Sequence, residues 1–205
     1  VYSQWGEDGI LNYLCEKIGI SKPKIVELGA GNFEECNSRF LAEYRHASAA
    51  PIDSRSDLYS SIQNLDLNWK TTISPQMAWI TPDNVNDILN SASQAIGRVD
   101  ILSLDIDGND YWVANSLDTK DIRIIVAEYN PIFGHENAVT VPRNDSFSRT
   151  SAHYSNLYYG ASLRAFINLF ESRNFTFVGT NRVGNNAFFV ASADVKNLDL
   201  QVPRT

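Results

Sequence analysis

The sequence predicts an α/β fold in which helices cover both faces of a mostly parallel sheet. Near-continuous apolar runs recur along the chain, the clearest at 99–107. Such runs are typical of strands that are buried on both faces, as in parallel sheets. Segments with helical spacing of apolar residues separate them. The last two runs, 175–179 and 186–190, are joined by a short link that contains Gly184, which predicts an antiparallel hairpin.

The size and charge of the chain exclude several classes. A length of 205 residues suits one domain, 1–205, with a sizeable core. A net charge of -7 disfavours broad affinity for nucleic acid or for anionic membrane. No apolar run approaches the ~18 residues of a membrane helix. The start shows no signal-peptide pattern and no initiator Met, so we expect a processed form or a fragment.

Two cysteines, Cys15 and Cys36, have neither metal-ligand nor redox spacing. We expect buried or half-buried thiols, in agreement with a reducing, cytoplasmic location.

The first half of the chain predicts two strands and two helices. The opening, through about residue 20, predicts a capped helix with Gly19 as its stop, packed near the site. Strand 24–28, helix 36–45 and strand 47–52 follow. Gln4, Glu7 and Asp8 either cap the first helix or contribute to a site, and both interpretations are open.

The second half continues the alternation. We expect a third strand at 69–73 and a helix with Thr81 at its N-cap and Pro82 at its first position. Gly97 ends that helix. Strands at 99–107 and 122–127 are followed by a long loop, 132–160, and a helix at 161–171. The loop is rich in aromatic residues, which argues against disorder and favours a substrate-side role.

The stretch from Lys24 to Asn32 passes from a strand into a turn with Gly29 and Gly31. In an open α/β sheet, ligands bind beyond the carboxyl ends of strands. Glycine permits close approach and positive φ there, although a plain strand-to-helix turn is also consistent with the pattern. Asp53, after the second strand, either holds the hydroxyls of a ribose or caps the helix near Ser56.

Polar residues also follow the fourth and fifth strands. Because parallel strands end at one edge, Asp105, Asp107 and Asp110 should converge with Glu128 and Asn130. Oxygen ligands of this kind suit Mg²⁺, and we expect Asp105, Asp107 and Asn130 as ligands. The alternative is a turn and helix cap. Without a metal, Asp107 or Glu128 is a candidate general base.

The aromatic loop offers other candidates. His135 and His153 each have a side chain suited to proton transfer, although loop histidines often only pack at the surface. We take His153 as the catalytic candidate. Tyr154, Tyr158 and Tyr159 either wall an acceptor pocket, since sugar faces stack on rings, or pack under the loop.

The ordered motifs resemble class I S-adenosylmethionine-dependent methyltransferases, in particular the FkbM-type group. The resemblance covers nearly the whole chain. It implies a Rossmann-like, seven-stranded sheet whose last strand is antiparallel, and S-adenosyl-L-methionine as cofactor. Its motifs are Ser3-Gln4-x-Gly6-Glu7-Asp8, Glu27-x-Gly29-x-Gly31, Leu104-Asp105-Ile106-Asp107-Gly108-Asn109-Asp110, Glu128-Tyr129-Asn130-Pro131, Tyr159-Gly160-Ala161-Ser162 and Asn185-Asn186-Ala187-Phe188-Phe189-Val190.

The resemblance assigns parts of the cofactor to positions. It implies that Glu27, Gly29 and Gly31 hold the methionine portion, that Asp53 holds the ribose, that Asp105 lies near the amino group, and that 76–78 lies near the adenine. Phe33 departs from the family pattern, where a glycine or small residue is common. The expected cofactor-binding residues are Gln4, Glu27, Gly29, Gly31, Asp53, Met77 and Asp105.

A dinucleotide site is disfavoured by the turn itself. Gly29-x-Gly31 is followed by Glu34, so the third glycine of that fingerprint is missing and a negative charge stands near the place of a pyrophosphate. No P-loop lysine is present. A cofactor with net positive charge suits this acidic turn better.

We therefore expect methyl transfer from S-adenosylmethionine to a hydroxyl of a sugar or secondary metabolite, with a small-molecule or glycan acceptor and Mg²⁺ as an optional aid. The acceptor class depends on family likeness alone. Nucleic acid and membrane are not expected as partners, and a homo-oligomer is left open. The alternatives are a non-catalytic binding module and a metal-dependent transferase or hydrolase that uses Asp105 and Asp107.

Overall fold

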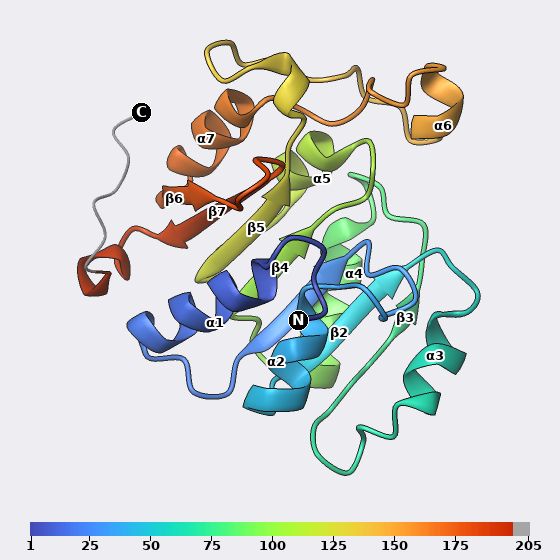
Figure 1. The fold of residues 1–205 in the computed structure, drawn as a ribbon, viewed down its shortest axis with the longest axis vertical. Coiled ribbons are helices and arrows are strands. Elements are labelled where there is room, and N and C mark those ends of the chain that lie inside the picture. Colours follow the sequence, from blue (N-terminus) through green and yellow to red (C-terminus); the bar gives the residue numbers. More distant parts are fainter. Residues whose placement is uncertain (199–205) are drawn as a thin grey trace.

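The computed structural model describes residues 1–198 and contains a seven-stranded sheet flanked by helices (Figure 1). The strand order is β3-β2-β1-β4-β5-β7-β6. The strands are β1 Lys24–Leu28, β2 Ser48–Asp53, β3 Gln76–Met77, β4 Ile101–Leu104, β5 Ile124–Glu128, β6 Phe175–Thr180 and β7 Asn186–Ala191. The helices are α1 Glu7–Ile18, α2 Ser38–Arg45, α3 Leu58–Asn64, α4 Val85–Ile96, α5 Asp110–Ser116, α6 Arg149–Ala152 and α7 Leu163–Glu171, with short 3-10 turns at Pro131–Phe133 and Val195–Asn197.

Strands β1 to β5 are parallel, and β7 pairs antiparallel with both β5 and β6. The predicted fold class is confirmed: the sheet is mostly parallel, ends in an antiparallel hairpin and is flanked by helices, as expected for a Rossmann-like fold.

Both faces of the sheet are buried, as the continuous apolar runs predicted. In β1, Val26 and Leu28 belong to the hydrophobic cluster under α4, α5 and α7, whereas Ile25 belongs to the cluster under α1. Figure 1 shows α1 and α2 in front of the sheet and α4 behind it. Since successive side chains of a strand point to opposite faces, a strand between two helical layers is apolar at most of its positions.

Glycines end two helices at the predicted positions. Gly19 follows α1 with φ 77° and its N–H bonds to carbonyls of the last turn. Gly97 follows α4 with φ 88°. Both backbone conformations are ones that side chains with a Cβ rarely adopt.

The predicted third strand at 69–73 is wrong. The strand β3 is Gln76–Met77, which pairs with Ile52 and Asp53, and Ile73 makes only an isolated bridge with Ala49. Trp69 is 78% exposed, so the apolar residues of that stretch do not share a buried face.

The predicted start of the next helix at Thr81 is also wrong, because α4 begins at Val85 with Asn84 at its N-cap. The side chain of Asn84 accepts the N–H of Thr81 at 2.8 Å, and the N–H of Asn84 bonds back to the Thr81 carbonyl at 3.3 Å. These two bonds fold residues 81–84 into a turn of their own.

The long loop, 132–160, is anchored to the body of the protein. The indole of Trp112 donates to the Val141 carbonyl at 2.8 Å, and the Gly160 N–H donates to the Gly108 carbonyl at 3.0 Å. The loop also contains the short helix α6.

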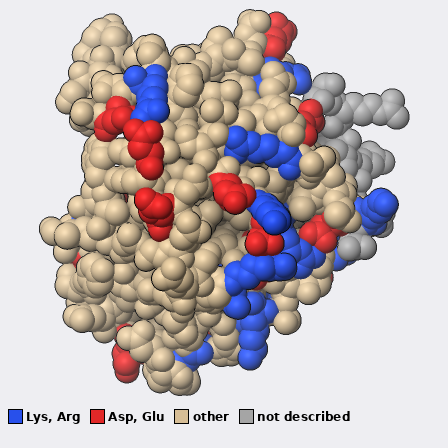
Figure 2. Space-filling view, turned by 180° about the vertical axis from the view of Figure 1, so that it is seen from behind, with Lys and Arg blue, Asp and Glu red and all other residues tan. Residues whose placement is uncertain are grey.

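Other general expectations can be compared directly with the fold. Cys15 and Cys36 are buried free thiols, as predicted. Among residues 1–198, no helix combines the length and apolar character needed to cross a membrane. On the face in Figure 2, basic side chains gather toward one side with acidic side chains between them, so this face carries both signs of charge.

Candidate active site

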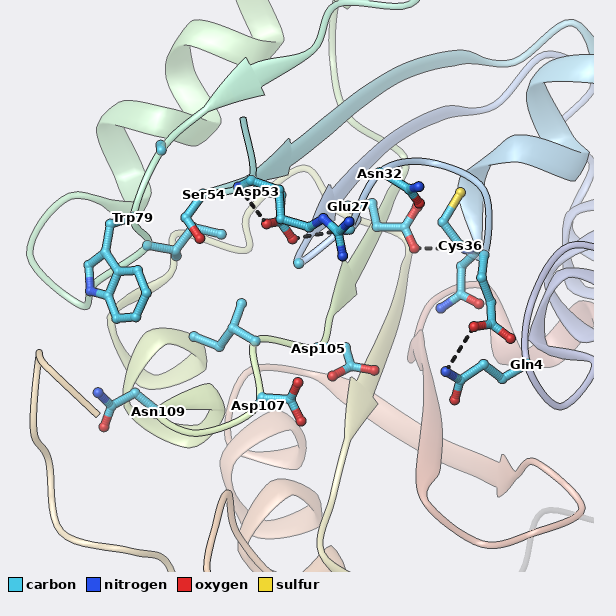
Figure 3. A pocket seen from close by; sticks show the side chains of 18 of the residues that line it. Gln4, Glu27, Asn32, Cys36, Asp53, Ser54, Trp79, Asp105, Asp107 and Asn109 are labelled. Atoms are coloured by element: carbon cyan, nitrogen blue, oxygen red, sulfur yellow. Dashed lines mark hydrogen bonds between the residues drawn. The ribbon is translucent and has the colours of Figure 1, made fainter. Parts of the chain in front are cut away.

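A cavity of about 500 Å³ lies at the carboxyl ends of β1, β2 and β4. Figure 3 shows Glu27 and Asp53 on one wall, Asp105 and Asp107 across from them, Trp79 at one end and Gln4 at the other. Seven of the residues that line it are acidic and one, Arg55, is basic. The acidic residues are Glu7, Glu27, Glu35, Asp53, Asp105, Asp107 and Asp145.

The glycine turn after β1 shapes the floor of this cavity. A Cβ on Gly29 would lie 1.6 Å from the Asp105 carbonyl oxygen, so only glycine permits β1 and β4 to end this close together. A Cβ on Gly31 would meet nothing within 4 Å, because that residue faces the open cavity. The two glycines therefore have different roles, one in packing and one in access.

Glu27 is buried beneath the turn and organises it. Its carboxylate accepts the N–H of Asn37 at 2.7 Å, and the N–H and hydroxyl of Ser38 at 3.0 and 2.5 Å. Burial raises the pKa of Glu27, and these donors partly offset the increase. Glu27 therefore holds the chain leading into α2 and also lines the cavity.

Asp53 bridges two loops at the end of β2. Its carboxylate accepts the N–H of Gly31 at 2.8 Å and the N–H of Arg55 at 2.9 Å. The capping alternative is excluded, because α3 begins at Leu58 with Asp57 at its N-cap. A carboxylate has lone pairs beyond these two bonds, so Asp53 can still accept from a ligand.

For Gln4, Glu7 and Asp8 the sequence left two interpretations open, helix capping or a role at the site, and the structure separates these residues. Gln4 and Glu7 line the cavity, and the Gln4 amide donates to Glu35 at 3.3 Å. The buried Glu7 carboxylate also accepts from the Asn181 amide at 2.5 Å. Asp8, in contrast, accepts the backbone N–H groups of residues 2 and 3, so it ties the segment before α1 to the helix without making a helix-cap bond.

Three carboxyl groups converge beyond β4 and β5. One oxygen each of Asp105, Asp107 and Glu128 lies within 4.8 Å of the others. Asp110 is not part of this group, because it accepts the N–H groups of Ile106 and Gly108, each at 2.8 Å. The turn-and-cap alternative therefore holds for Asp110 alone. We call Asp105, Asp107 and Glu128 the acidic trio.

Glu128 is the least satisfied member of the acidic trio. It is 6% exposed, and its Oε2 is the one buried side-chain N or O atom in the described residues with no hydrogen-bond partner. Buried polar atoms are rarely left unpaired, so this oxygen indicates a missing ligand or proton. Burial and the charge of Asp105 raise the pKa of Glu128, and burial followed by the charge of Asp110 raises that of Asp105.

Three predicted site residues lie elsewhere. The Asn130 amide nitrogen donates to the carbonyls of Leu157 at 2.8 Å and Tyr159 at 3.0 Å, and its Oδ1 accepts the Ile132 N–H at 3.1 Å, so both ends of the amide fix the loop. Met77 is 55% exposed and does not line the cavity. His153 is exposed and its Nδ1 lies 2.7 Å from the Ser155 hydroxyl, away from the cavity lining.

Phe33 does not enter the cavity. It is fully buried in a small cluster with Cys36 and residues of α2 and α3, with φ 67°. The left-handed conformation directs the ring into the core behind the turn. The departure from the family pattern is therefore accommodated by packing, and Phe33 does not line the cavity.

The sequence patterns missed several residues at the cavity. Trp79 lines one end, and its indole donates to the Asp145 carbonyl in the long loop at 2.8 Å. Phe147, from the same loop, packs so closely on Gly108 that a Cβ there would lie 2.3 Å from the ring. Arg149 pairs with Asp107, 2.5 Å between Nη1 and Oδ1. The apolar pair Trp79-Ile80, which follows the edge strand β3, was the one sequence feature that could have indicated this end of the cavity.

Comparison of the fold with solved structures finds methyltransferases. A candidate caffeoyl-CoA O-methyltransferase from Staphylococcus aureus matches with a TM-score of 0.53 at 13% identity, over 90% of this chain and 82% of that one. An S-adenosylmethionine-dependent methyltransferase from Clostridium acetobutylicum matches with a TM-score of 0.50 at 8% identity, over 92% and 90%. The Methanococcus jannaschii fibrillarin pre-rRNA processing protein matches with a TM-score of 0.50 at 10% identity, over 84% and 67%.

No protein-family model and no curated protein matches the sequence. At identities this low, likeness establishes the fold. The chain has the fold of S-adenosylmethionine-dependent methyltransferases, and membership of the FkbM-type group stays a prediction from the sequence motifs.

Proposed function

We propose that this chain is an S-adenosylmethionine-dependent methyltransferase that acts on a hydroxyl of a sugar or secondary metabolite. The observation that carries the proposal is the acidic cavity at the carboxyl ends of β1, β2 and β4. Its volume, about 500 Å³, falls within the range of small-molecule sites. Its excess of carboxylates favours a ligand with net positive charge over a phosphate-bearing one.

The lining suits each part of such a cofactor. Trp79 and Ile80 offer an apolar end to an adenine, and Asp53 offers carboxylate oxygens to a ribose diol. Gly31 leaves space for close approach of the methionine portion. Glu27 and Asp105 supply negative charge for its ammonium group. The cofactor, when bound, would supply an electrophilic methyl group.

The acidic trio would activate the acceptor. Asp107 is the member best placed to take a proton, because its side chain is 63% exposed and faces the cavity. Glu128 has a raised pKa, so it holds its proton at neutral pH and orients the acceptor as a hydrogen-bond donor. A positioned base is typically worth 10²–10⁴ in rate. His153 is too far into the exposed loop to be preferred.

A divalent cation fits the same place. Three carboxyl oxygens within 4.8 Å of one another are hard ligands, and the unpaired Oε2 of Glu128 would gain a partner. The ligand set would then be Asp105, Asp107 and Glu128, with Glu128 in place of the predicted Asn130. Such an ion, when bound, would lower the pKa of an acceptor hydroxyl.

The test is calorimetric binding of S-adenosylhomocysteine. We expect Asp53→Ala to weaken binding by roughly 1–3 kcal/mol, because it leaves polar groups of the ligand and the Gly31 N–H unpaired. Asp121→Ala is the matched control, since Asp121 precedes β5 at the opposite edge of the sheet. Failure of the wild-type chain to bind would overturn the proposal, and equal affinity of the two variants would remove Asp53 from the site.

Turnover separates the remaining alternatives. A non-catalytic module would bind S-adenosylhomocysteine without methylating any acceptor, whereas a metal-dependent hydrolase or transferase would need a divalent ion and no cofactor. Methyl transfer to a hydroxyl panel, measured with and without EDTA and compared with Asp107→Asn, distinguishes these outcomes.

A further inference from the structure

Charge is distributed unevenly between the cavity and the loop beside it. The chain has 24 acidic residues, yet none occurs in the 146–170 segment. That segment contains Arg149, His153 and Arg164 instead. The cavity lining has the opposite balance, with seven acidic residues and one basic residue. The cofactor side of the site is therefore acidic, and the adjoining 146–170 segment is neutral to basic.

Arg149 is the basic residue that reaches the site from this segment. Its guanidinium carbon lies 3.7 Å from the centre of the Tyr159 ring, and the ring is 6% exposed. Its Nε donates to the Asn156 carbonyl at 2.8 Å, and its Nη1 donates to Asp107 at 2.5 Å. A guanidinium that covers an aromatic ring and makes two hydrogen bonds has little conformational freedom left to lose when a ligand binds.

The guanidinium still has donors to offer. It carries five N–H groups, and within residues 1–198 its hydrogen bonds are those from Nε and Nη1. The side chain is 30% exposed. One N–H of Nη1 and two of Nη2 remain after those bonds, and a pair of N–H groups on neighbouring guanidinium nitrogens matches the geometry of a carboxylate.

We propose that Arg149 binds a carboxylate of the methyl acceptor, and that the acceptor is an acidic sugar of the uronate type. The inference rests on the proposed methyltransferase function and names the substrate class of that site. Tyr158, 42% exposed, directly precedes the Tyr159 ring that Arg149 covers, and it offers a ring face to a sugar. The negative charge of Asp107 would repel an anionic acceptor, so recognition depends on the guanidinium.

The experiment compares two ligands that differ only in the carboxylate. Methyl β-glucuronide and methyl β-glucoside are titrated by NMR into protein saturated with S-adenosylhomocysteine. We expect the wild-type chain to bind the glucuronide at least ~10-fold more tightly, since a charge-assisted bidentate bond contributes on the order of tenfold or more. Arg149→Met should abolish the preference, and Arg149→Lys should keep part of it.

Arg164→Met is the matched control, because Arg164 lies in the same segment and its Nε bonds to the His135 carbonyl, not to the acidic trio. This variant should keep the full preference. No preference in the wild-type chain, no binding of the glucuronide, or a preference that survives in Arg149→Met would overturn the inference. Binding of S-adenosylhomocysteine is measured separately, so loss of carboxylate recognition alone leaves the methyltransferase proposal standing.

Discussion

Substituting each glycine of the β1 turn with alanine should give opposite outcomes. In Gly29→Ala the new methyl carbon would begin 1.6 Å from the Asp105 carbonyl oxygen, whereas ordinary contact needs 3.4 Å or more. Backbone has to move, which breaks the bond from the Asp105 N–H to the Leu28 carbonyl, now 3.0 Å. Left-handed strain of roughly 1–2 kcal/mol and a lost hydrogen bond of about 1 kcal/mol give a loss of about 2–3 kcal/mol. This is a large share of a typical total stability of about 5–15 kcal/mol.

Gly31→Ala should cost only about 1 kcal/mol of stability, from backbone strain alone, because nothing lies within 4 Å of the new Cβ. It should instead weaken S-adenosylhomocysteine binding at least tenfold, since the methyl group projects into the cavity. Urea unfolding followed by circular dichroism measures stability, and calorimetry measures affinity. The reasoning fails if Gly29→Ala stays within about 1 kcal/mol of wild type or if the two variants lose equal stability.

Three further predictions concern the core and the site. In the unfolded chain Glu128 has a pKa of about 4.3, and burial raises its pKa in the folded protein. The free energy of unfolding should therefore fall as the pH rises above about 4.3. Glu128→Gln should flatten this slope and stabilise the unliganded protein at pH 7 by at least about 1.4 kcal/mol, one pKa unit; urea titrations from pH 4 to 9 that show an unchanged slope would contradict it. Phe33→Ala should lose about 3–5 kcal/mol of stability yet keep S-adenosylhomocysteine affinity, because the ring packs in the core; a calorimetric loss of affinity in the folded variant would place Phe33 at the site. Arg173→Ala should lose about 1.5–3 kcal/mol, because its guanidinium donates to three carbonyls at the end of α5; a midpoint equal to wild type in thermal unfolding would show that water satisfies them.

The sequence was most informative where one physical requirement dominates. The predicted and observed bounds of strand 24–28 are the same, because Ile25, Val26 and Leu28 face helical layers on both sides of the sheet and so form a recognisable apolar run. Gly19 and Gly97 end helices as predicted, because their positive φ favours glycine. The same preference of glycine for positive φ made the turn with Gly29 and Gly31 recognisable in the sequence. The sequence did not show that one glycine serves packing and the other serves access to the cavity.

Local patterns failed where a tertiary partner decides the outcome. Residues 69–73 have strand-forming composition but lack a continuous neighbour, whereas Gln76 and Met77 pair with the end of β2. The turn at 81–84 depends on the Asn84 side chain, which accepts the Thr81 N–H. Neither choice is visible in composition or periodicity.

The candidate site shows the same division. Asp105, Asp107 and Glu128 were placed at one edge by strand order, but sequence could not tell that Glu128 joins the acidic trio while Asn130 ties down the loop. Trp79 reaches the site from just beyond β3, whose pairing the sequence did not predict, and Arg149 reaches it from the long loop, so only their contacts reveal them.

The sequence by itself determined the layered α/β architecture, the hairpin at its end, and the edge of the sheet where acidic side chains gather. These features follow from local requirements of backbone geometry and burial, and only a few residue types meet each requirement. The tertiary structure alone decided which carboxyl groups meet, which amide is used for loop anchoring, and which arginine faces the acidic trio. Those outcomes depend on distances between segments far apart in the chain, and a side chain's type does not encode its partner.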